Sequence, residues 1–159
     1  MTDQPGAERE IVLEAEYPHS IETVWAALTD PSKLAIWFRK NDFAPVLGRP
    51  FEFYYQPSPS GNWPGTLFGE ILELVPHTRM VWSWSTPPAL PVNTSVLTWT
   101  LTPTPAGTHV KLVQRGFPEE DQFKSQAAMT EGWAWHVEDL GTFLEGGHLE
   151  PQFDPNAGP

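Results

Sequence analysis

The side chains with the clearest potential for chemistry are a histidine and an amide among large aromatic rings. His136 lies in the segment EGWAWHVEDLGTFLEGG (131–147), and Gln114 shares a strand face with Val110 and Leu112. An imidazole at the edge of an interior can donate, accept or carry a proton, and a buried amide is costly unless it is hydrogen-bonded. Each of the two side chains therefore either orients a ligand or forms a structural hydrogen bond, and the sequence leaves both alternatives open.

Carboxylates and a tyrosine are further candidates for acid–base chemistry. In the segment TLFGEILELV (66–75), one strand face reads Phe68, Glu70, Leu72 and Leu74, and the other reads Leu67, Gly69, Ile71, Glu73 and Val75. Both faces are mainly apolar and each carries one glutamate, so a β-bulge could hide which face points inward. If the protein is an enzyme, Glu70, Tyr55 and His136 are the candidates for general acid–base catalysis.

No signature of catalysis or metal binding accompanies these residues. The sequence contains no G-x-S-x-G, no H-E-x-x-H and no Gly-rich phosphate loop that ends in Lys-Ser/Thr. Cysteine is absent, which excludes disulfides, thiol chemistry and cysteine-zinc sites. The five histidines lie far apart along the chain. We therefore expect no catalytic residue set, no metal site and no cofactor, and a binding protein rather than an enzyme.

A helix that ends near Glu145 must position His136. A helical wheel places Trp133, Val137, Leu140 and Leu144 on one stripe, with His136 beside it and Trp135 on the opposite side. The spacing predicts a helix over about 121–145, with Gly146 and Gly147 as its C-terminal stop. The interior therefore receives Trp133 and Leu140, and Trp135 is expected to be exposed.

Strands must supply the surface that this helix covers. Alternation of apolar and polar residues predicts strands over 9–17, 50–56, 66–75, 79–85, 95–102 and 108–117. Two short helices are expected after the first strand, with N-caps at Ser20 and Asp30 and with Pro31 in the first turn of the second helix. The Pro-rich segments 57–65 and 86–94 are expected to be loops. A run of antiparallel strands followed by one long helix indicates an α+β fold in which the helix covers one face of the sheet.

The composition narrows the possible partners. The chain has 159 residues, 40% of them hydrophobic, and eight tryptophans, which suffice for one domain with a large aromatic core. Net charge is −11, and the nine basic residues are scattered, so binding of nucleic acid is not expected. No apolar run reaches the length of a membrane span, and no secretion signal opens the chain. A cytoplasmic location is therefore expected.

Several segments together resemble a known family. They are IETVWAALTDPSKLAIWF, GRPFEF, GEILELVPHTRMVWSWS, LTWTLTP, GTHVKLVQRGF and GWAWHVEDLGTFLEGG, in the family's order. They are similar to the branch of the START-like (SRPBCC, helix-grip) superfamily that contains homologues of the activator of the heat-shock protein 90 ATPase. The resemblance implies a helix-grip fold, in which a curved antiparallel sheet wraps around a long C-terminal helix and encloses a hydrophobic cavity. The domain would span 9–147, between a flexible N-terminus (1–8) and an irregular C-terminal tail (148–159).

The favoured function is binding or carriage of a small, mostly neutral hydrophobic molecule in this cavity. The alternatives are a protein-interaction module, such as a chaperone cofactor, and an acid–base enzyme that uses the same cavity. A protein partner or a homodimer is also possible. The residues expected to bind the ligand are Trp37, Phe38, Phe53, Tyr55, Phe68, Glu70, Trp82, Trp84, Trp99, Gln114, Trp133, His136 and Leu140.

The charge of the ligand follows from the strand faces. No Lys or Arg falls on the faces assigned as inward, so an anion would enter without a cationic partner a protein of net charge −11. Burying an unpaired anion is costly. The sequence therefore predicts neutral aromatic or polycyclic ligands and poor binding of fatty-acid anions.

Overall fold

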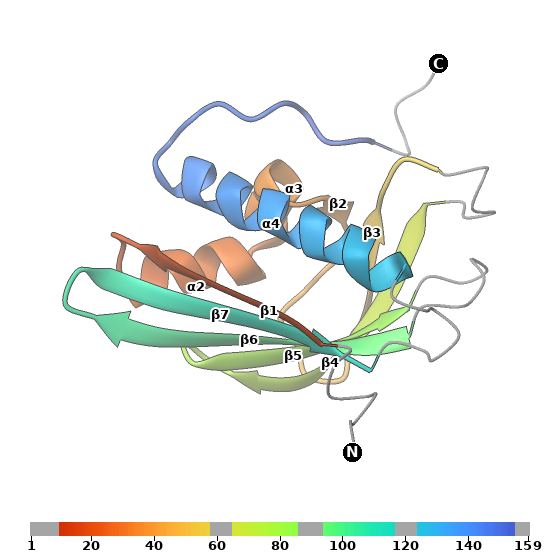
Figure 1. Cartoon of the computed structure of the whole chain (residues 1–159), viewed down its shortest axis with the longest axis horizontal. Coiled ribbons are helices and arrows are strands. Elements are labelled where there is room, and N and C mark those ends of the chain that lie inside the picture. Colours follow the sequence, from red (N-terminus) through yellow and green to blue (C-terminus); the bar gives the residue numbers. More distant parts are fainter. Residues whose placement is uncertain (1–9, 58–64, 86–93, 117–123, 155–159) are drawn as a thin grey trace.

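One antiparallel sheet curls around the C-terminal helix. The computed structural model of the protein describes residues 10–57, 65–85, 94–116 and 124–154, and its strands lie in the order β1-β7-β6-β5-β4-β3-β2. The strands are β1 (Glu10–Tyr17), β2 (Lys40–Asn41), β3 (Pro50–Tyr54), β4 (Thr66–Val75), β5 (Arg79–Ser85), β6 (Thr94–Thr104) and β7 (Gly107–Arg115). The helices α2 (Ile21–Thr29), α3 (Pro31–Trp37) and α4 (Lys124–Leu144) lie on one side of the sheet (Figure 1). The predicted α+β helix-grip architecture is confirmed.

The element boundaries agree with the sequence prediction to within a few residues. The two-residue strand β2 was not predicted, because two residues are too short to show alternation. The expected flexible N-terminus (1–8), most of both Pro-rich loops, the first residues of the expected helix (121–123) and the end of the tail (155–159) lie outside the described residues. None of the described helices is both long and apolar enough to cross a membrane.

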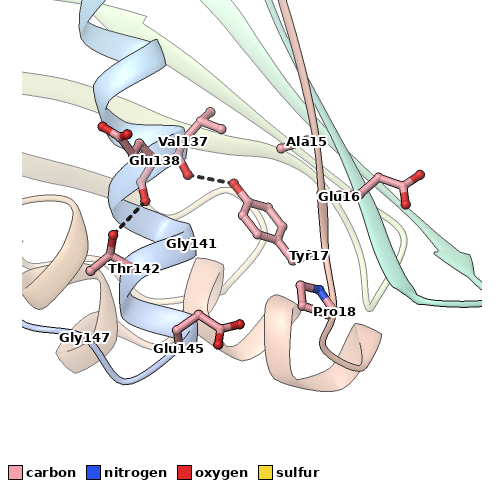
Figure 2. A pocket seen from close by; sticks show the side chains of 10 residues that line it. All are labelled: Ala15, Glu16, Tyr17, Pro18, Val137, Glu138, Gly141, Thr142, Glu145 and Gly147. Atoms are coloured by element: carbon pink, nitrogen blue, oxygen red, sulfur yellow. Dashed lines mark hydrogen bonds between the residues drawn. The ribbon is translucent and has the colours of Figure 1, made fainter.

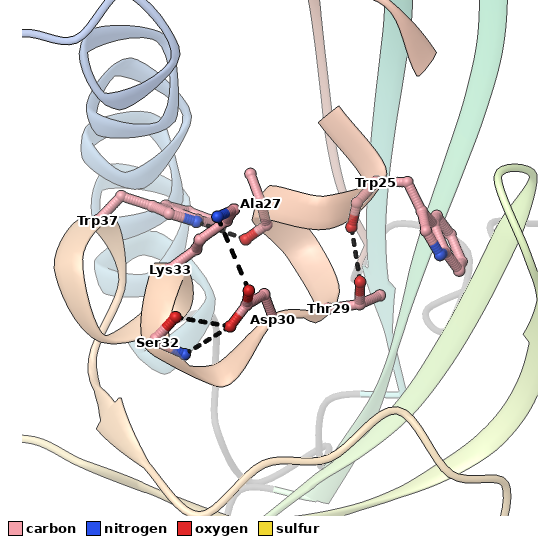
Figure 3. Close-up of polar contacts among 7 residues, drawn as sticks. All are labelled: Trp25, Ala27, Thr29, Asp30, Ser32, Lys33 and Trp37. Carbon is pink, nitrogen blue, oxygen red and sulfur yellow. Dashed lines mark hydrogen bonds and ion pairs between the residues drawn. The ribbon is translucent and has the colours of Figure 1, made fainter. Parts of the chain in front are cut away.

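Two capping residues fix the turn between α2 and α3. Ser20 Oγ accepts a hydrogen bond from the backbone N–H of Thr23 at 3.2 Å, as predicted for an N-cap. Asp30 Oδ1 accepts from the backbone N–H of Ser32 at 2.9 Å, and Pro31 starts α3 (Figure 3). Trp37, at the end of α3, donates from Nε1 to the carbonyl oxygen of Ala27 at 2.7 Å. This bond ties the last turn of α3 to α2 and sets the position of the residues that follow.

A glycine ends α4 and turns the chain back over the helices. Gly146 has a φ of 76°, a conformation that suits glycine, and the Gly147 N–H donates to Thr142 O at 2.8 Å. The segment after α4 then returns along the helices toward β3 (Figure 1). Residues 148–154 contain no helix or strand, and the side chain of Gln152 donates to the Ile36 carbonyl oxygen at 3.4 Å. The tail therefore packs beside α3.

The apolar stripe of α4 faces the sheet as the helical wheel predicts. Trp133 is 2% exposed and Leu140 is 1% exposed, while Val137 and Leu144 pack partly buried against the same core. Trp135 is 61% exposed, which confirms that it lies on the opposite side. The described tail residues (148–154) therefore do not cover the Trp135 ring.

A β-bulge in β4 changes which of its residues point inward. The pairing of β4 with β5 shifts between Ile71 and Glu73, and Leu67 and Ile71 are fully buried before the shift. A Cβ on Gly69 would lie 2.5 Å from Cζ of Phe51, so the glycine leaves room for that inward ring.

Two of the predicted ligand-binding residues lie on the outer face of the sheet and not on the face that α4 covers. Phe68 is 40% exposed and Glu70 is also exposed, both on the outer face of the sheet. The prediction that they line the interior is wrong, because alternation alone could not choose between two mainly apolar faces. Glu73 also points outward and pairs with Arg79, whose Nε lies 3.0 Å from Glu73 Oε1.

Truncation of Leu140 tests the assignment of the buried stripe. Leu140→Ala removes a fully buried side chain, and we expect it to lower the free energy of unfolding by about 2–5 kcal/mol. Glu138→Ala, an exposed change on the same helix, serves as the control and should stay within about 0.5 kcal/mol of the wild type. Urea unfolding measures both values, and equal effects of the two changes would show that the face is misassigned.

Candidate functional site

Large aromatic side chains meet between α3, α4 and the concave face of the sheet. We call this cluster the aromatic interior, and it consists of Trp37, Phe38, Phe53, Trp82, Trp84, Trp99 and Trp133, each no more than 4% exposed. Tyr55 and His136 lie at its edge, Tyr55 partly buried and His136 7% exposed. Each of these side chains was predicted from the sequence as ligand-binding, and the fold brings them together.

Phe38 lies at the centre of the ring contacts. Its ring stacks on Trp133 with centroids 5.5 Å apart and an interplanar angle of 18°. It also meets the ring of His136 with centroids 4.5 Å apart and that of Phe53 with centroids 4.7 Å apart, both edge to face, at 79° and 65°. Phe38 is the residue at which α3 ends, with φ −113° and ψ −91°, outside the helical range. The end of α3 therefore inserts a ring into the space that faces α4.

Two interior phenylalanines were missing from the predicted set. Phe51 and Phe43 are 2% and 3% exposed, and their centroids lie 5.3 and 5.4 Å from that of Trp82. Alternation along the predicted strand 50–56 already placed Phe51 on the inward face with Phe53. Phe43 lies outside any helix or strand, where the backbone N–H donates to Asn41 Oδ1 at 2.9 Å, and no periodicity indicates its direction.

Gln114 forms structural hydrogen bonds with both ends of its amide. Trp133 Nε1 donates to Gln114 Oε1 at 2.8 Å, and Gln114 Nε2 donates to Ser95 Oγ at 2.7 Å. Gln114 and Ser95 are 0% and 3% exposed. Of the two roles left open by the sequence, the structural hydrogen bond is therefore the one observed.

Other polar atoms of the aromatic interior lack such partners. In the described part of the chain, no hydrogen-bond partner is present for Nε1 of Trp82, Trp84 and Trp99, or for Nδ1 of His136. Most buried polar groups in proteins are hydrogen-bonded, so unpartnered ones call for an explanation. An indole N–H can only donate. The interior therefore offers hydrogen-bond donors to an acceptor that the described residues do not supply.

His136 is held in its neutral form. Burial, and secondly the charge of Arg39, lower its pKa from 6.5 to about 3. At neutral pH the imidazole therefore carries no charge and can act as a hydrogen-bonding group. Burial also raises the pKa of the Tyr55 hydroxyl, which keeps it protonated. Glu70, the third acid–base candidate, lies on the outer face of the sheet and does not join them.

A cation reaches the edge of the aromatic interior. The guanidinium carbon of Arg39 lies 4.3 Å from the centroid of the Tyr55 ring, and the side chain is half-buried. The expectation that no cation would approach the site is therefore wrong. Strand alternation assigns a direction only to residues within strands, and Arg39 comes from the segment between α3 and β2.

A separate open groove lies between the end of β1 and the C-terminal half of α4 (Figure 2). Its volume is about 580 Å³, and it is lined by Ala15, Glu16, Tyr17, Pro18, Val137, Glu138, Gly141, Thr142, Glu145 and Gly147. The Tyr17 hydroxyl donates to the Val137 carbonyl oxygen at 2.8 Å, which ties β1 to α4. None of the predicted ligand-binding residues lines this groove, and none of the unpartnered buried atoms named above belongs to it.

The described residues also contain no group of three or more His, Cys, Asp or Glu side chains that could hold a metal ion.

Replacement of Gln114 tests the bond between helix and sheet. Gln114→Met keeps the length of the side chain but leaves Trp133 Nε1 buried without an acceptor. We expect the free energy of unfolding to fall by about 1–3 kcal/mol in urea. Ser95→Ala removes only the acceptor of Gln114 Nε2 and keeps the hydrogen bond between Trp133 and Gln114, so it should cost less. A Gln114→Met protein as stable as the wild type would contradict the structural role.

The pKa of His136 predicts a specific pH dependence of stability. Below pH 6.5 the unfolded chain gains a proton that the folded protein takes up only near pH 3. Stability is therefore lost as pH falls through this window, by up to about 1.4 kcal/mol per pH unit. His136→Phe removes this proton uptake and leaves the neighbouring Arg39, Glu138 and Asp139 in place. Between pH 6 and pH 4 we expect the unfolding free energy of the wild type to fall relative to that of the variant. A constant difference between the two proteins would contradict the neutral buried imidazole.

Comparisons with known proteins agree with this architecture. Residues 18–145 match the family described as Activator of Hsp90 ATPase homolog 1-like protein. No curated protein shows significant similarity to the chain. Among solved structures, the protein MLL2253 from Mesorhizobium loti is 34% identical, with a TM-score of 0.78 over 88% of this chain and 99% of that chain.

Two more distant structures show the same fold. The protein CV1439 from Chromobacterium violaceum is 23% identical, with a TM-score of 0.70 over 87% of this chain and 98% of that chain. DynU16, a protein of the dynemicin biosynthetic locus, is 23% identical, with a TM-score of 0.69 over 86% of this chain and 47% of that chain. The family match covers most of the chain, and the structure from Mesorhizobium loti is 34% identical to it over 88% of its length. The chain therefore belongs to the family of Activator of Hsp90 ATPase homolog 1-like proteins, as its segments implied.

Proposed function

We propose that the protein binds or carries a small, mostly neutral hydrophobic molecule between the sheet and α4. The observation that carries this proposal is a set of four buried polar atoms in the aromatic interior, on Trp82, Trp84, Trp99 and His136, to which the described residues supply no hydrogen-bond partner. Apolar walls with a few polar groups are typical of small-molecule sites. Three of the four atoms belong to indole N–H groups, so the ligand needs hydrogen-bond acceptors, such as carbonyl oxygens, on an aromatic body.

Entry of such a ligand requires movement of a ring, and Phe38 is the best placed to move. It occupies the space between Trp133, Phe53 and His136, and it lies at a helix end rather than within a strand. A ring that leaves this position would expose the face of Trp133 for stacking. The main alternative is a purely structural core in which the indole N–H groups face neighbouring rings, which satisfies them weakly.

A matched pair of compounds separates these alternatives. Fluorenone and fluorene share one ring system, but only fluorenone has a carbonyl acceptor. We expect fluorenone to bind more tightly, by about tenfold for one additional hydrogen bond. Quenching of tryptophan emission measures both affinities, in a Trp135→Phe background that removes the emission of this exposed ring. Native mass spectrometry of protein purified from its own host tests for a retained ligand.

Variants of the interior tryptophans serve as matched controls. Trp82→Phe, Trp84→Phe and Trp99→Phe each remove one unpartnered N–H and keep a ring. At least one should weaken fluorenone binding and leave fluorene binding unchanged. If neither compound binds and no ligand is retained, the binding function is wrong.

The exposed Trp135 favours the second candidate function, a protein-interaction module. Its ring is 61% exposed on the side of α4 that faces away from the sheet. Exposed tryptophans are enriched where partners bind. The same titration decides between the candidates, because an interaction module needs no ligand in the aromatic interior.

A further inference from the structure

Arg39 is a half-buried cation for which the described residues supply no carboxylate partner. Of the ion pairs that the structure describes, none involves Arg39. Its Nη1 donates to two neutral oxygens, the Phe38 carbonyl oxygen at 2.9 Å and Oε1 of Gln152. A guanidinium presents five N–H groups in a planar fork that matches a carboxylate. In a protein of net charge −11, a partly desolvated guanidinium without an acidic partner calls for an explanation.

The position of Arg39 links the solvent to the aromatic interior. The guanidinium lies over Tyr55, and the Tyr55 ring meets Phe38 with centroids 6.3 Å apart. Phe38 in turn stacks on Trp133. A molecule with its rings against Trp133 would therefore have its outer end beside Arg39.

The groups of α4 that face Arg39 leave its charge available. His136 is neutral at physiological pH, so it does not compete for an anion. The Arg39 charge also acts on Asp139, where burial and Glu138 raise the pKa of the carboxyl group. No ion pair joins Asp139 to Arg39 among the described contacts, so the carboxyl group is close but not bound.

Gln152 of the tail holds the position that an anion would take. Its Oε1 accepts from Arg39 Nη1, while its Nε2 reaches the Ile36 carbonyl oxygen only at 3.4 Å. A neutral amide oxygen is a weaker acceptor for a guanidinium than a carboxylate. A ligand carboxylate could therefore displace the Gln152 side chain.

We infer that Arg39 binds a carboxylate on an otherwise neutral aromatic ligand, and that Gln152 occupies this position until the ligand arrives. The inference rests on the proposed function and assigns the class of ligand as an aromatic monocarboxylic acid. It also replaces the expectation of ligands without any charge, because the body of the ligand stays neutral while its one acidic group remains at the edge of the site.

The test compares an acid with its matched alcohol. Isothermal titration calorimetry at neutral pH would use a fluorenone carboxylate and the corresponding hydroxymethyl fluorenone. We expect the wild type to prefer the acid by about tenfold. Arg39→Gln should remove this preference by weakening the acid and leaving the alcohol unchanged. Arg39→Lys, which keeps the charge but not the fork, should retain part of the preference.

Two further variants complete the design. Gln152→Ala should strengthen binding of the acid severalfold, because it frees Nη1 of Arg39, and it should leave the alcohol unchanged. Arg49→Gln removes an exposed cation outside the site and controls for the change in net charge.

Each result has a distinct meaning. Equal affinities of acid and alcohol in the wild type, or equal losses of both in Arg39→Gln, would overturn the role of Arg39 and leave the binding function intact. An unchanged affinity of the acid in Gln152→Ala would overturn the role of Gln152. If neither compound binds the wild type, both the inference and the proposed function fail.

Discussion

The hydrogen bond from Trp133 to Gln114 is the constraint on which the interior depends. An indole ring brings a large apolar area into the core, together with one N–H that needs an acceptor. Gln114 supplies the acceptor from β7 at 2.8 Å, and its own amide is satisfied by Ser95 on β6. The bond fixes the distance of α4 from the end of β7. The positions of Leu140, His136 and the rings that contact Trp133 follow from it.

The second determinant of the site is the point at which α3 ends. Asp30 and Pro31 set its start, and the bond from Trp37 to Ala27 holds its last turn. The chain then leaves the helix at Phe38, so that successive residues point in different directions. Phe38 enters the aromatic interior, and Arg39 lies over Tyr55 at its edge. A neutral His136 beside Arg39 completes a site with an apolar body and one charged end.

The strand β4 shows where alternation stops being informative. Its two faces are about equally apolar, and a bulge shifts the pattern between Ile71 and Glu73. The direction of Phe68 and Glu70 was therefore decided by pairing with β5 and by the space that Gly69 leaves for Phe51. The strand faces with one clear apolar row, such as that of Trp82 and Trp84, needed no such information.

The sequence by itself determined the order of the elements, the caps at Ser20 and Asp30, the stop at Gly146 and the buried stripe of α4. These features depend on residues close together in the chain, where periodicity and capping preferences act directly. Only the tertiary structure decided that Gln114 bonds to Trp133, that Phe43 joins the rings, and that Arg39 meets both Tyr55 and the tail residue Gln152. Those contacts join residues from separate elements, and no local pattern records a distance that the curl of the sheet sets.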